Sequence, residues 1–472
     1  MAEQNTTTSN QGSPLSRKLS GWRGVRGEGR LCILGGGESG VGAALLAKQQ
    51  GYDVFLSDAG FINEKYKSEL SEHKIEFEEG GHTAEKIFNA NEIVKSPGIP
   101  EKNEMIKAIR AKQIPVISEI ELAYRFKNDA KIVAITGSNG KSTTTSLVYH
   151  ICKTAGMDCA LVGNIGYSFA KQIAEDPKPL YVAEISSFQL DDIKDFRADV
   201  SVLLNITEDH LDRYDYKFDN YINSKFRIIQ NATANDCFIY NADDEVIMNK
   251  LQQTTLHTNS LPFSMKHELT NGGNINGKTM TLRVNEERIS WSIYDFALKG
   301  KHNQYNTMAS CIAALVIGIR KEKIREAVTD FQSLEHRMEH VATVRGVEFI
   351  NDSKATNVNS TWYALESMEK PVVLILGGLD KGNDYSLIED LVKEKVKAIV
   401  CMGIDNSKIH EAFDGIVSPI VDTDSAADAV NDAFHLAEKG DVVLLSPACA
   451  SFDLFKNYED RGTQFKNAVK DL

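Results

Sequence analysis

The sequence predicts an α/β protein with about three domains. Its 472 residues are enough for three domains of roughly 150 residues each. Short apolar segments alternate along the chain with Gly-rich turns and amphipathic segments, a pattern typical of the strands and helices of parallel sheets. With 42% apolar and 25% charged residues, the composition excludes collagen-like, mucin-like and wholly disordered proteins.

Net charge and the pattern of cysteines limit the functions and cellular locations that the sequence allows. Lys and Arg number 53 and Asp and Glu 66, a net charge of −13, which argues against a nucleic-acid binder but leaves room for a small basic pocket for an anionic metabolite. No apolar run approaches the ~20 residues that span a membrane, and the start has no signal-peptide core. The seven cysteines are scattered and form no CxxC pair. We therefore expect reduced thiols, no zinc cluster, no membrane contact and a cytoplasmic protein.

The N-terminal part begins with a segment that has almost nothing to bury. Residues 1–29 are rich in Thr, Ser and Gly, so we expect a disordered tail that belongs to no domain. The first domain is predicted at 30–122. Within it, apolar strands at 31–34 and 54–56 flank a Gly-rich turn and a helix from Val41, which together form one βαβ unit.

A possible nucleotide motif lies in this unit. Gly35, Gly37 and Gly40 follow the first strand, and Asp58 follows the second, which fits the spacing of a dinucleotide fingerprint. NAD(P), another nucleotide or a purely structural turn are all compatible with it. Because the chain has a separate ATP motif and no evident hydride-transfer site, we favour a different nucleotide-bearing substrate.

The second domain is predicted at 123–334. A connecting helix at 120–127 leads into it, and a polar stretch from about 250 to 290 carries turn signals at 271–274 and 276–277 that favour β-hairpins. The other expected elements are strands at 132–135, 181–185 and 200–205, a helix from Lys141 and a buried helix at 303–319.

The strongest motif is a phosphate loop between the strand at 132–135 and the helix that follows. Its sequence is Thr136-Gly137-Ser138-Asn139-Gly140-Lys141-Ser142-Thr143. Glycines let backbone N–H groups converge on phosphate oxygens, Lys141 would meet the β- and γ-phosphates, and the Ser142 hydroxyl would meet Mg²⁺. The gap between the glycines is two residues shorter than the standard loop, so this is a variant. An ordinary βα turn has no need of Lys followed by hydroxyl residues, and we expect ATP binding.

Metal-ligand candidates follow the next two strands. Glu184 ends one strand, and Asp209 and His210 come shortly after the other. Ligands bind at the carboxyl ends of strands in α/β folds, and Mg²⁺ needs few protein ligands. A lone His is more often a surface residue, but its position after a buried strand favours a functional role.

The third domain is predicted at 335–472. It is again α/β, because helical segments separate its apolar strands. Those strands are expected at 347–350, 372–376, 398–402 and 442–445.

Several segments in one register resemble the Mur ligases. The resemblance runs from about residue 30 to the end. It rests on residues 136–143, 163–166, 184–190, 207–214, 300–303, 336–337 and 351–357. Residues 445–462, Leu-Ser-Pro-Ala-Cys-Ala-Ser-Phe-Asp-Leu-Phe-Lys-Asn-Tyr-Glu-Asp-Arg-Gly, resemble the family member that adds D-glutamate. The resemblance implies a Rossmann-like N-terminal domain for a UDP substrate, a central P-loop ATPase domain and a Rossmann-like C-terminal domain for the amino acid.

The resemblance also implies an activity. The carboxylate of UDP-N-acetylmuramoyl-L-alanine would take the γ-phosphoryl group of ATP, and D-glutamate would attack the acyl phosphate, a step in peptidoglycan precursor synthesis. The implied UDP-substrate residues are Gly37, Ser39, Asp58, Ser96, Gly98, Asn164 and Gln189. The implied ATP residues are those at 137–143 with Asn303, Arg337 and Asp352. Ala59 and Gly60 depart from the Thr-Arg of some members.

Catalytic and amino-acid residues follow from the same resemblance. Two Mg²⁺ sites are implied, with ligands Ser142, Glu184, His210 and Lys225. Lys225 stands at the family's carbamylated lysine, whose CO₂ adduct is an anion; by itself it would be taken for a solvated helix lysine. Lys141, Lys225, His210 and Lys354 are the implied catalytic set. The implied D-glutamate residues are Thr356, Lys381, Ser451 and Tyr458. Leu379 replaces an acid of some members, and Tyr458 a Phe.

Other functions stay open at this point. A sister ligase could add L-alanine, or a folate-type ligase could act on another acid, although the latter would not need the domain of Gly35 and Gly40. A diamino-acid ligase would be expected to carry its own C-terminal motif. A non-enzymatic P-loop switch or an NAD-linked protein would not need Lys354, Lys381 and Ser451 in a third domain. We expect a monomer by default.

Overall fold

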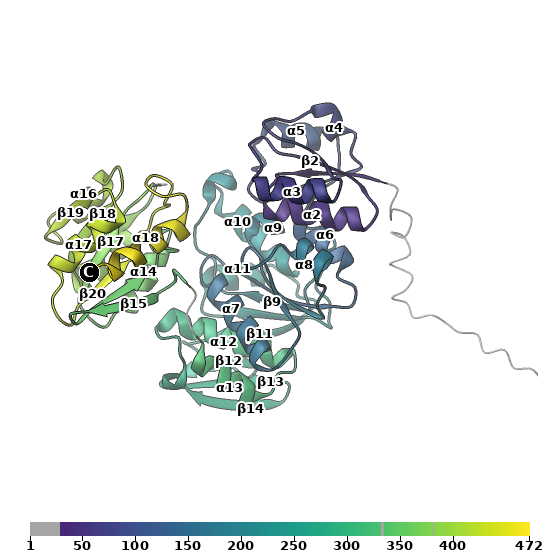
Figure 1. The fold of residues 1–472 in the computed structure, drawn as a ribbon. Coiled ribbons are helices and arrows are strands. Elements are labelled where there is room, and N and C mark those ends of the chain that lie inside the picture. The colour runs from purple at the N-terminus through teal and green to yellow at the C-terminus, as the bar shows by residue number, and fades with distance from the viewer. Residues whose placement is uncertain (1–28, 332–334, 381) are drawn as a thin grey trace, which may run out of the picture.

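The computed structural model describes residues 29–331, 335–380 and 382–472. They form three α/β domains around sheets of five, nine and six strands, which confirms the predicted fold class. In Figure 1 the first domain (purple) lies on the second (blue to green), and the third (green to yellow) stands to one side. Almost all of the predicted tail, 1–29, lies outside the described residues, as does Lys381. No helix in the described part of the chain is long and apolar enough to cross a membrane.

The first domain has a fully parallel sheet in the order β3-β2-β1-β4-β5. The strands are β1 (Arg30–Leu34), β2 (Asp53–Ser57), β3 (Glu76–Glu78), β4 (Glu92–Lys95) and β5 (Val116–Ser118). The helices are α2 (Glu38–Gln49), α3 (Glu64–Glu72), α4 (Ala84–Phe88), α5 (Glu104–Ala111) and α6 (Glu119–Phe126). Strand order reverses at β1, so the turns after β1, β2 and β4 meet at a switch point. The boundary predicted after residue 122 lies within α6.

The second domain centres on β6, which lies between β8 and β9 in the nine-stranded sheet. Its strands are β6 (Lys131–Thr136), β7 (Ala160–Gly163), β8 (Leu180–Glu184), β9 (Val200–Leu203), β10 (Cys237–Asn241), β11 (Asn259–Ser264), β12 (Gly272–Asn276), β13 (Thr279–Val284) and β14 (Glu287–Ser292). Its helices are α7 (Lys141–Thr154), α8 (Phe169–Glu175), α9 (Ser187–Leu190), α10 (Phe218–Phe226), α11 (Glu245–Gln252), α12 (Lys301–Val316) and α13 (Lys321–Asp330). Helix α12 ends before the predicted residue 319 because Gly318 takes a left-handed φ of +88°, a common helix stop.

The stretch predicted to hold hairpins does hold two. Strand β13 pairs antiparallel with β12 and with β14, and its turn to β14 uses Asn285 and Glu286 at positive φ, as tight hairpin turns require. The turn expected at 271–274 was wrong, because Gly272 begins β12. A Cβ on Gly272 would lie 1.9 Å from the Pro262 carbonyl oxygen. Glycine is therefore needed there for close strand pairing.

The third domain has a six-stranded sheet in the order β15-β16-β20-β17-β18-β19, parallel except for the β15–β16 pair. The strands are β15 (Glu339–Val344), β16 (Val347–Asn351), β17 (Val372–Leu376), β18 (Val396–Met402), β19 (Ile420–Thr423) and β20 (Val442–Leu445). The helices are α14 (Val358–Glu366), α15 (Glu389–Lys395), α16 (Ser407–Phe413), α17 (Ala426–Leu436) and α18 (Tyr458–Lys470).

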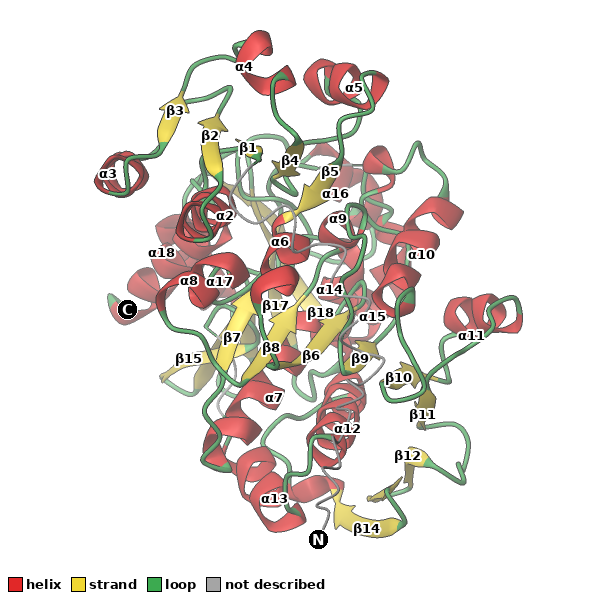
Figure 2. Cartoon of the chain, turned by 90° about the vertical axis from the view of Figure 1, so that its right-hand side faces the viewer, coloured by secondary structure: helices red, strands yellow, loops and turns green. Residues whose placement is uncertain are grey.

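The first two domains share one hydrophobic core. It includes Leu46 of α2, Ile120 of α6, Phe169 of α8 and Tyr181 of β8, and the three helices pack together at the junction (Figure 2). The buried carboxylate of Glu119 accepts hydrogen bonds there from the Ser168 hydroxyl and the Ala170 N–H, both at 2.6 Å. By contrast, the third domain has cores built only from its own residues.

Candidate functional site

The predicted phosphate loop forms the turn between β6 and α7. Gly137 and Gly140 have φ values of +156° and +83°, and a Cβ on Gly140 would lie 2.4 Å from Asn306 Oδ1, so both glycines are required. The segment after β9 holds the loop: the Ser138 N–H donates to the Asn205 carbonyl and the Ser138 hydroxyl to the Thr207 carbonyl, each at 2.9 Å. Asn205 was not singled out from the sequence.

Two lysine side chains converge beneath this loop. Lys141 Nζ donates to the carbonyl oxygens of Gly137 and Ser138 at 2.7 and 2.8 Å. Lys225 Nζ donates to the same Gly137 oxygen at 2.8 Å and lies 4.6 Å from the centre of the Tyr221 ring. Burial lowers the pKa of both amines. The pKa of Lys225 falls well below its ordinary value, mainly because of burial and further because of the positive charge of Lys141.

Three of the predicted metal ligands lie at this loop: Ser142 belongs to it, Lys225 donates to it, and Glu184 is near enough to act on the pKa of Lys141. Glu184 is 1% exposed at the end of β8. Its Oε1 accepts a hydrogen bond from Asn164 Nδ2 at 2.7 Å, whereas its buried Oε2 has no hydrogen-bond partner among the described residues. His210 has a left-handed φ of +54° and a ring centre 5.1 Å from that of Phe188. Ser142, at the start of α7, is buried.

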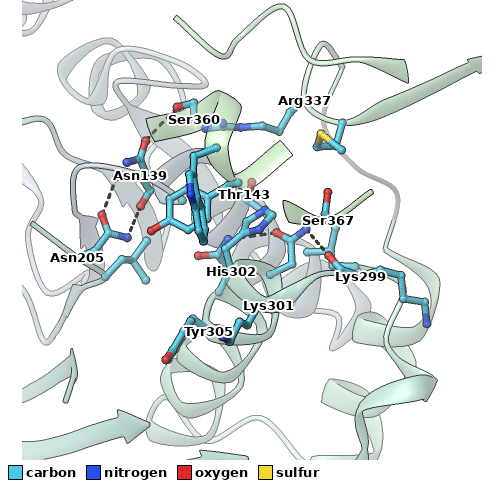
Figure 3. A pocket seen from close by; sticks show the side chains of 18 of the residues that line it. Asn139, Thr143, Asn205, Lys299, Lys301, His302, Tyr305, Arg337, Ser360 and Ser367 are labelled. Atoms are coloured by element: carbon cyan, nitrogen blue, oxygen red, sulfur yellow. Dashed lines mark hydrogen bonds between the residues drawn. The ribbon is translucent and has the colours of Figure 1, made fainter. Parts of the chain in front are cut away.

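A cavity of about 590 Å³ lies between the second and third domains (Figure 3). It is lined by six of the predicted ATP residues: Asn139, Gly140, Thr143, Asn303, Arg337 and Asp352. The other four, Gly137, Ser138, Lys141 and Ser142, belong to the adjoining loop. The Ser360 hydroxyl donates to Asn139 Oδ1 at 3.1 Å, so α14 of the third domain contacts the phosphate loop directly.

Polar side chains deep in this cavity are held neutral or paired. Burial raises the pKa of Asp352 to about 6, and its carboxylate accepts hydrogen bonds from the Ser446 hydroxyl at 3.1 Å and the Met338 N–H at 3.2 Å. Burial also lowers the pKa of His302 to about 4, and its ring centre lies 5.1 Å from that of Tyr363. Although His302 stands in the quoted segment 300–303, the sequence analysis gave it no role.

The predicted UDP residues follow the strands of the first domain. Gly37 caps α2 and Ser39 lies in its first turn, while Ser96 and Gly98 follow β4. Asp58 accepts hydrogen bonds from the N–H groups of Gly36 and Gly60, so its carboxylate joins the Gly-rich turn after β1 to its own turn after β2. Across the domain boundary, Gln189 accepts from the Ser186 N–H at 2.9 Å and caps α9.

Arg213 connects these loops to the metal-ligand segment. Its guanidinium donates to the carbonyl oxygens of Pro97, Gly98 and Ile99 at 3.0 to 3.3 Å and lies 4.3 Å from the centre of the Phe188 ring. Phe188 in turn contacts His210. No sequence signal assigned this role to Arg213, because its partners lie more than a hundred residues away.

Of the residues predicted in the third domain, Lys354 and Tyr458 lie close enough to Glu184 to feel its charge. Lys354 Nζ lies 5.4 Å from the centre of the Tyr458 ring, and burial lowers its pKa while Glu184 acts in the opposite direction. Ser451 is buried and Thr356 is exposed. The buried Arg461, which the sequence analysis missed, donates to the carbonyl oxygens of Ser353 at 2.8 Å and Cys449 at 3.2 Å. It thereby joins the Lys354 and Ser451 segments.

Comparison with known proteins agrees with this division of the chain. Residues 30–105 match the MurD N-terminal domain, 135–314 the Mur ligase middle domain and 336–449 the Mur ligase glutamate ligase domain. The fold is shared with the solved structure of UDP-N-acetylmuramate-alanine ligase MurC from Thermotoga maritima. The TM-score is 0.60 at 16% sequence identity, and the match covers 94% of this chain and 100% of that one. MurF ligase of the same organism has a TM-score of 0.58 at 14% identity, and the match covers 89% of this chain and 95% of that one.

Sequence relatives are closer. The UDP-N-acetylmuramoylalanine--D-glutamate ligase of Christiangramia forsetii is 52% identical over 94% of this chain and 99% of its own length. The enzyme of the same name from Bacteroides fragilis is 53% identical over 94% of this chain and 100% of its own length. These matches confirm the resemblance seen in the sequence. The chain therefore belongs to the Mur ligases, and within them to the UDP-N-acetylmuramoylalanine--D-glutamate ligase family.

Proposed function

We propose that the chain adds D-glutamate to UDP-N-acetylmuramoyl-L-alanine with ATP, by way of an acyl phosphate. The carboxylate oxygen of the UDP substrate attacks the γ-phosphorus of ATP, and ADP leaves. The amine of D-glutamate then attacks the acyl carbon, so that an amide bond forms and phosphate and a proton are released. The observation that carries this is the phosphate loop of 136–143, which borders a nucleotide-sized cavity between two domains.

The loop and the cavity supply what ATP needs. Backbone N–H groups at the start of α7 would face the phosphates, and the Lys141 amine would exchange its loop carbonyl partners for phosphate oxygens. Both would neutralise charge that builds up during transfer. Asn303, Arg337 and Asp352 would hold the adenine nucleotide, with Asp352 at its ribose. His302 Nδ1, buried without a hydrogen-bond partner in the described part of the chain, offers one more polar atom to the base.

The donor set around Glu184 fits Mg²⁺. Hard oxygen ligands suit this ion, and a buried carboxylate oxygen without a partner, Glu184 Oε2, is costly unless a cation or a donor meets it. Ser142, Glu184, His210 and a modified Lys225 would hold two Mg²⁺ ions between them. Bound Mg²⁺ would neutralise phosphate oxygens and so reduce their repulsion toward an attacking carboxylate.

A carbamate on Lys225 would complete this set. A neutral amine attacks CO₂, an N–C bond forms and one proton leaves, which converts the side chain into an anion. Burial lowers the pKa of the Lys225 amine, which favours the neutral form that this reaction needs. A negative group here would also attract the Lys141 ammonium instead of repelling it.

The amino acid would bind on the third domain. D-Glutamate carries two carboxylates, which favour cations and hydroxyl donors. These cations and hydroxyl donors would come from Thr356, Lys381, Ser451 and Tyr458. Lys354 would lie by the transferring phosphoryl group. The UDP substrate would bind on the first domain and the adjoining edge of the second, at Gly37, Ser39, Asp58, Ser96, Gly98, Asn164 and Gln189. The acceptor carboxylate and the amine would then meet at the phosphate loop.

Phosphate release tests this proposal directly. Purified chain would be mixed with ATP, Mg²⁺ and UDP-N-acetylmuramoyl-L-alanine, and each amino acid would be added in turn. We expect release with D-glutamate, and loss of release in Lys141→Ala. Release with L-alanine or a diamino acid, but not with D-glutamate, would contradict the proposed specificity.

A further inference from the structure

A mixed cluster of possible metal ligands lies on the third domain, away from the phosphate loop. Cys401 is on β18 and Asp422 on β19, and the two residues are direct partners in the parallel pairing of these strands. Their side chains therefore leave the sheet on the same face. His410, on α16, lies over this face, and its ring nitrogen, the Cys401 sulfur and an Asp422 oxygen all lie within 4.8 Å of one another.

The spacing of these atoms is close to that of a tetrahedral site. His410 Nε2 lies 3.2 Å from both carboxylate oxygens of Asp422. Zn²⁺ bonds of about 2.0–2.3 Å at tetrahedral angles put neighbouring ligand atoms roughly 3.3–3.8 Å apart. The Cys401 sulfur, within 4.8 Å of the other two ligand atoms, would have to move closer to them when the ion binds.

The ring of His410 is oriented as metal-bound imidazoles are. Its other nitrogen, Nδ1, lies 3.2 Å from Asp414 Oδ1, and a carboxylate on the second ring nitrogen is the usual partner of a ligating His. On the other side, Asn406 Nδ2 donates to Asp422 Oδ1 at 2.9 Å and fixes that carboxylate.

His410 and Asp422 line a surface hollow that favours cations, and the buried Cys401 lies behind them. The hollow has a volume of about 720 Å³, and its described lining contains no Lys or Arg. It does contain four aspartates besides Asp422, namely Asp405, Asp424, Asp428 and Asp432. Their summed charge lowers the energy of a cation in the hollow, and the Asp422 side chain is 58% exposed, so an ion can enter from solvent.

We propose that Cys401, His410 and Asp422 bind a single Zn²⁺ ion, with water as the fourth ligand. Sulfur and imidazole ligands select zinc-like transition metals over Mg²⁺ and Ca²⁺, which prefer oxygen alone. Binding replaces the thiol proton of Cys401 by a Zn–S bond and releases that proton to solvent. The absence of CxxC spacing hides this site from the sequence, because the ligands come from three separate elements.

The site would act on the position of α16. Its ligands join this helix to β18 and β19. On the same helix, Lys408 Nζ donates to Asp380 Oδ1 at 2.7 Å, in the segment that leads to the predicted glutamate-binding residue 381. A bound ion would therefore stiffen the support of that segment without touching the reacting groups.

Cobalt substitution gives the sharpest test. Full-length protein stripped with chelator would be titrated with Co²⁺, and sulfur-to-cobalt charge-transfer absorption would be recorded. We expect the band to appear at one equivalent and to be absent in Cys401→Ser but present in Cys449→Ser. The predicted Mg²⁺ residues include no cysteine, so cobalt bound there gives no such band. A wild-type protein without the band, or a band that survives in Cys401→Ser, would overturn the proposal.

Zinc affinity supplies a second, independent measurement. The surface variants His410→Gln and Asp422→Asn should weaken Zn²⁺ binding by calorimetry by roughly 100-fold, and Asp414→Asn by roughly tenfold. The control His435→Gln, an exposed residue on α17, should bind as wild type does. If His410→Gln bound Zn²⁺ as tightly as wild type does, the proposal would be wrong. The cluster of Cys401, His410 and Asp422 would then be held by an ion pair and a thiol hydrogen bond alone.

Discussion

Lys141 and Lys225 donate to one and the same atom, the carbonyl oxygen of Gly137, over 2.7 and 2.8 Å. Two buried ammonium groups on a single oxygen repel each other strongly. Each lysine belongs to a different helix, so only the fold brings them together. This repulsion adds to the effect of burial, which lowers the pKa of both amines, and of Lys225 the more strongly.

Replacement of Lys225 by Ala should abolish ligation, because the proposed carbamate anion is lost. Short carboxylates such as acetate or propionate should restore part of the rate by entering the space left by the side chain. Lys225→Arg, which keeps a cation but cannot react with CO₂, should stay inactive. The rate of phosphate release checks all three, and full activity of Lys225→Ala would refute the carbamate.

Glu184→Gln should reduce kcat by roughly 100-fold or more and raise the Mg²⁺ concentration needed for half-maximal rate. The amide keeps the shape of the side chain and its contact with Asn164, but removes the charge at Oε2. Initial rates across a Mg²⁺ series give both numbers. The exposed Glu175→Gln serves as the control, and an unchanged Mg²⁺ dependence in Glu184→Gln would exclude it as a ligand.

Arg213→Ala should raise KM for the UDP substrate by roughly tenfold, since three charge-assisted hydrogen bonds to the 97–99 loop are lost. KM for ATP should not change, because the cavity lined by Asn303 and Arg337 is untouched. Steady-state kinetics with each substrate varied would separate the two. Arg325→Ala removes only a surface ion pair with Asp295 and should behave as wild type. Equal rises in both KM values would show a general loss of structure instead.

Glu119→Gln should make stability less dependent on pH. Burial raises the pKa of Glu119 from 4.5 to about 6, so the folded state keeps its proton where the unfolded chain has lost it. Below about pH 4.5, Glu119 therefore has no effect on the free energy of unfolding. Its destabilising effect grows as the pH rises from 4.5 to 6 and reaches about 2 kcal/mol above pH 6. Urea unfolding at pH 5 and pH 7.5 should show Glu119→Gln gaining on wild type at the higher pH. A constant difference between the two proteins would contradict the shift.

The fold was predictable because its signals are local. Apolar runs such as 132–135, followed by glycines and a helical pattern, specify a strand, a turn and a helix from neighbouring residues alone. The same holds for the phosphate loop, whose function needs consecutive residues. Where a local signal had two meanings the prediction failed, as at Gly272, because a glycine that permits close strand pairing looks like a glycine in a turn.

The contacts between domains were not predictable in this way. Arg213, Glu119 and Arg461 each act on backbone groups far away in the sequence, and an isolated Arg or Glu carries no sign of what it will meet. Lys225 shows the limit most clearly, since only the resemblance to a family distinguished it from a surface lysine. Its burial became visible once the helix was packed beneath the Gly137 carbonyl.

The hydrophobic core shared by α2, α6 and α8 has a consequence for cooperativity. A chain with three sheets has only two units that can unfold independently, because the first two domains lose their common core together, whereas the third keeps its own. Calorimetry should resolve two transitions, and ATP should shift both, since its cavity is lined from each side. We therefore expect relative motion mainly between the third domain and the unit formed by the first two domains. Within that unit, the shared core should hold the loops of the first domain at a nearly constant distance from the phosphate loop.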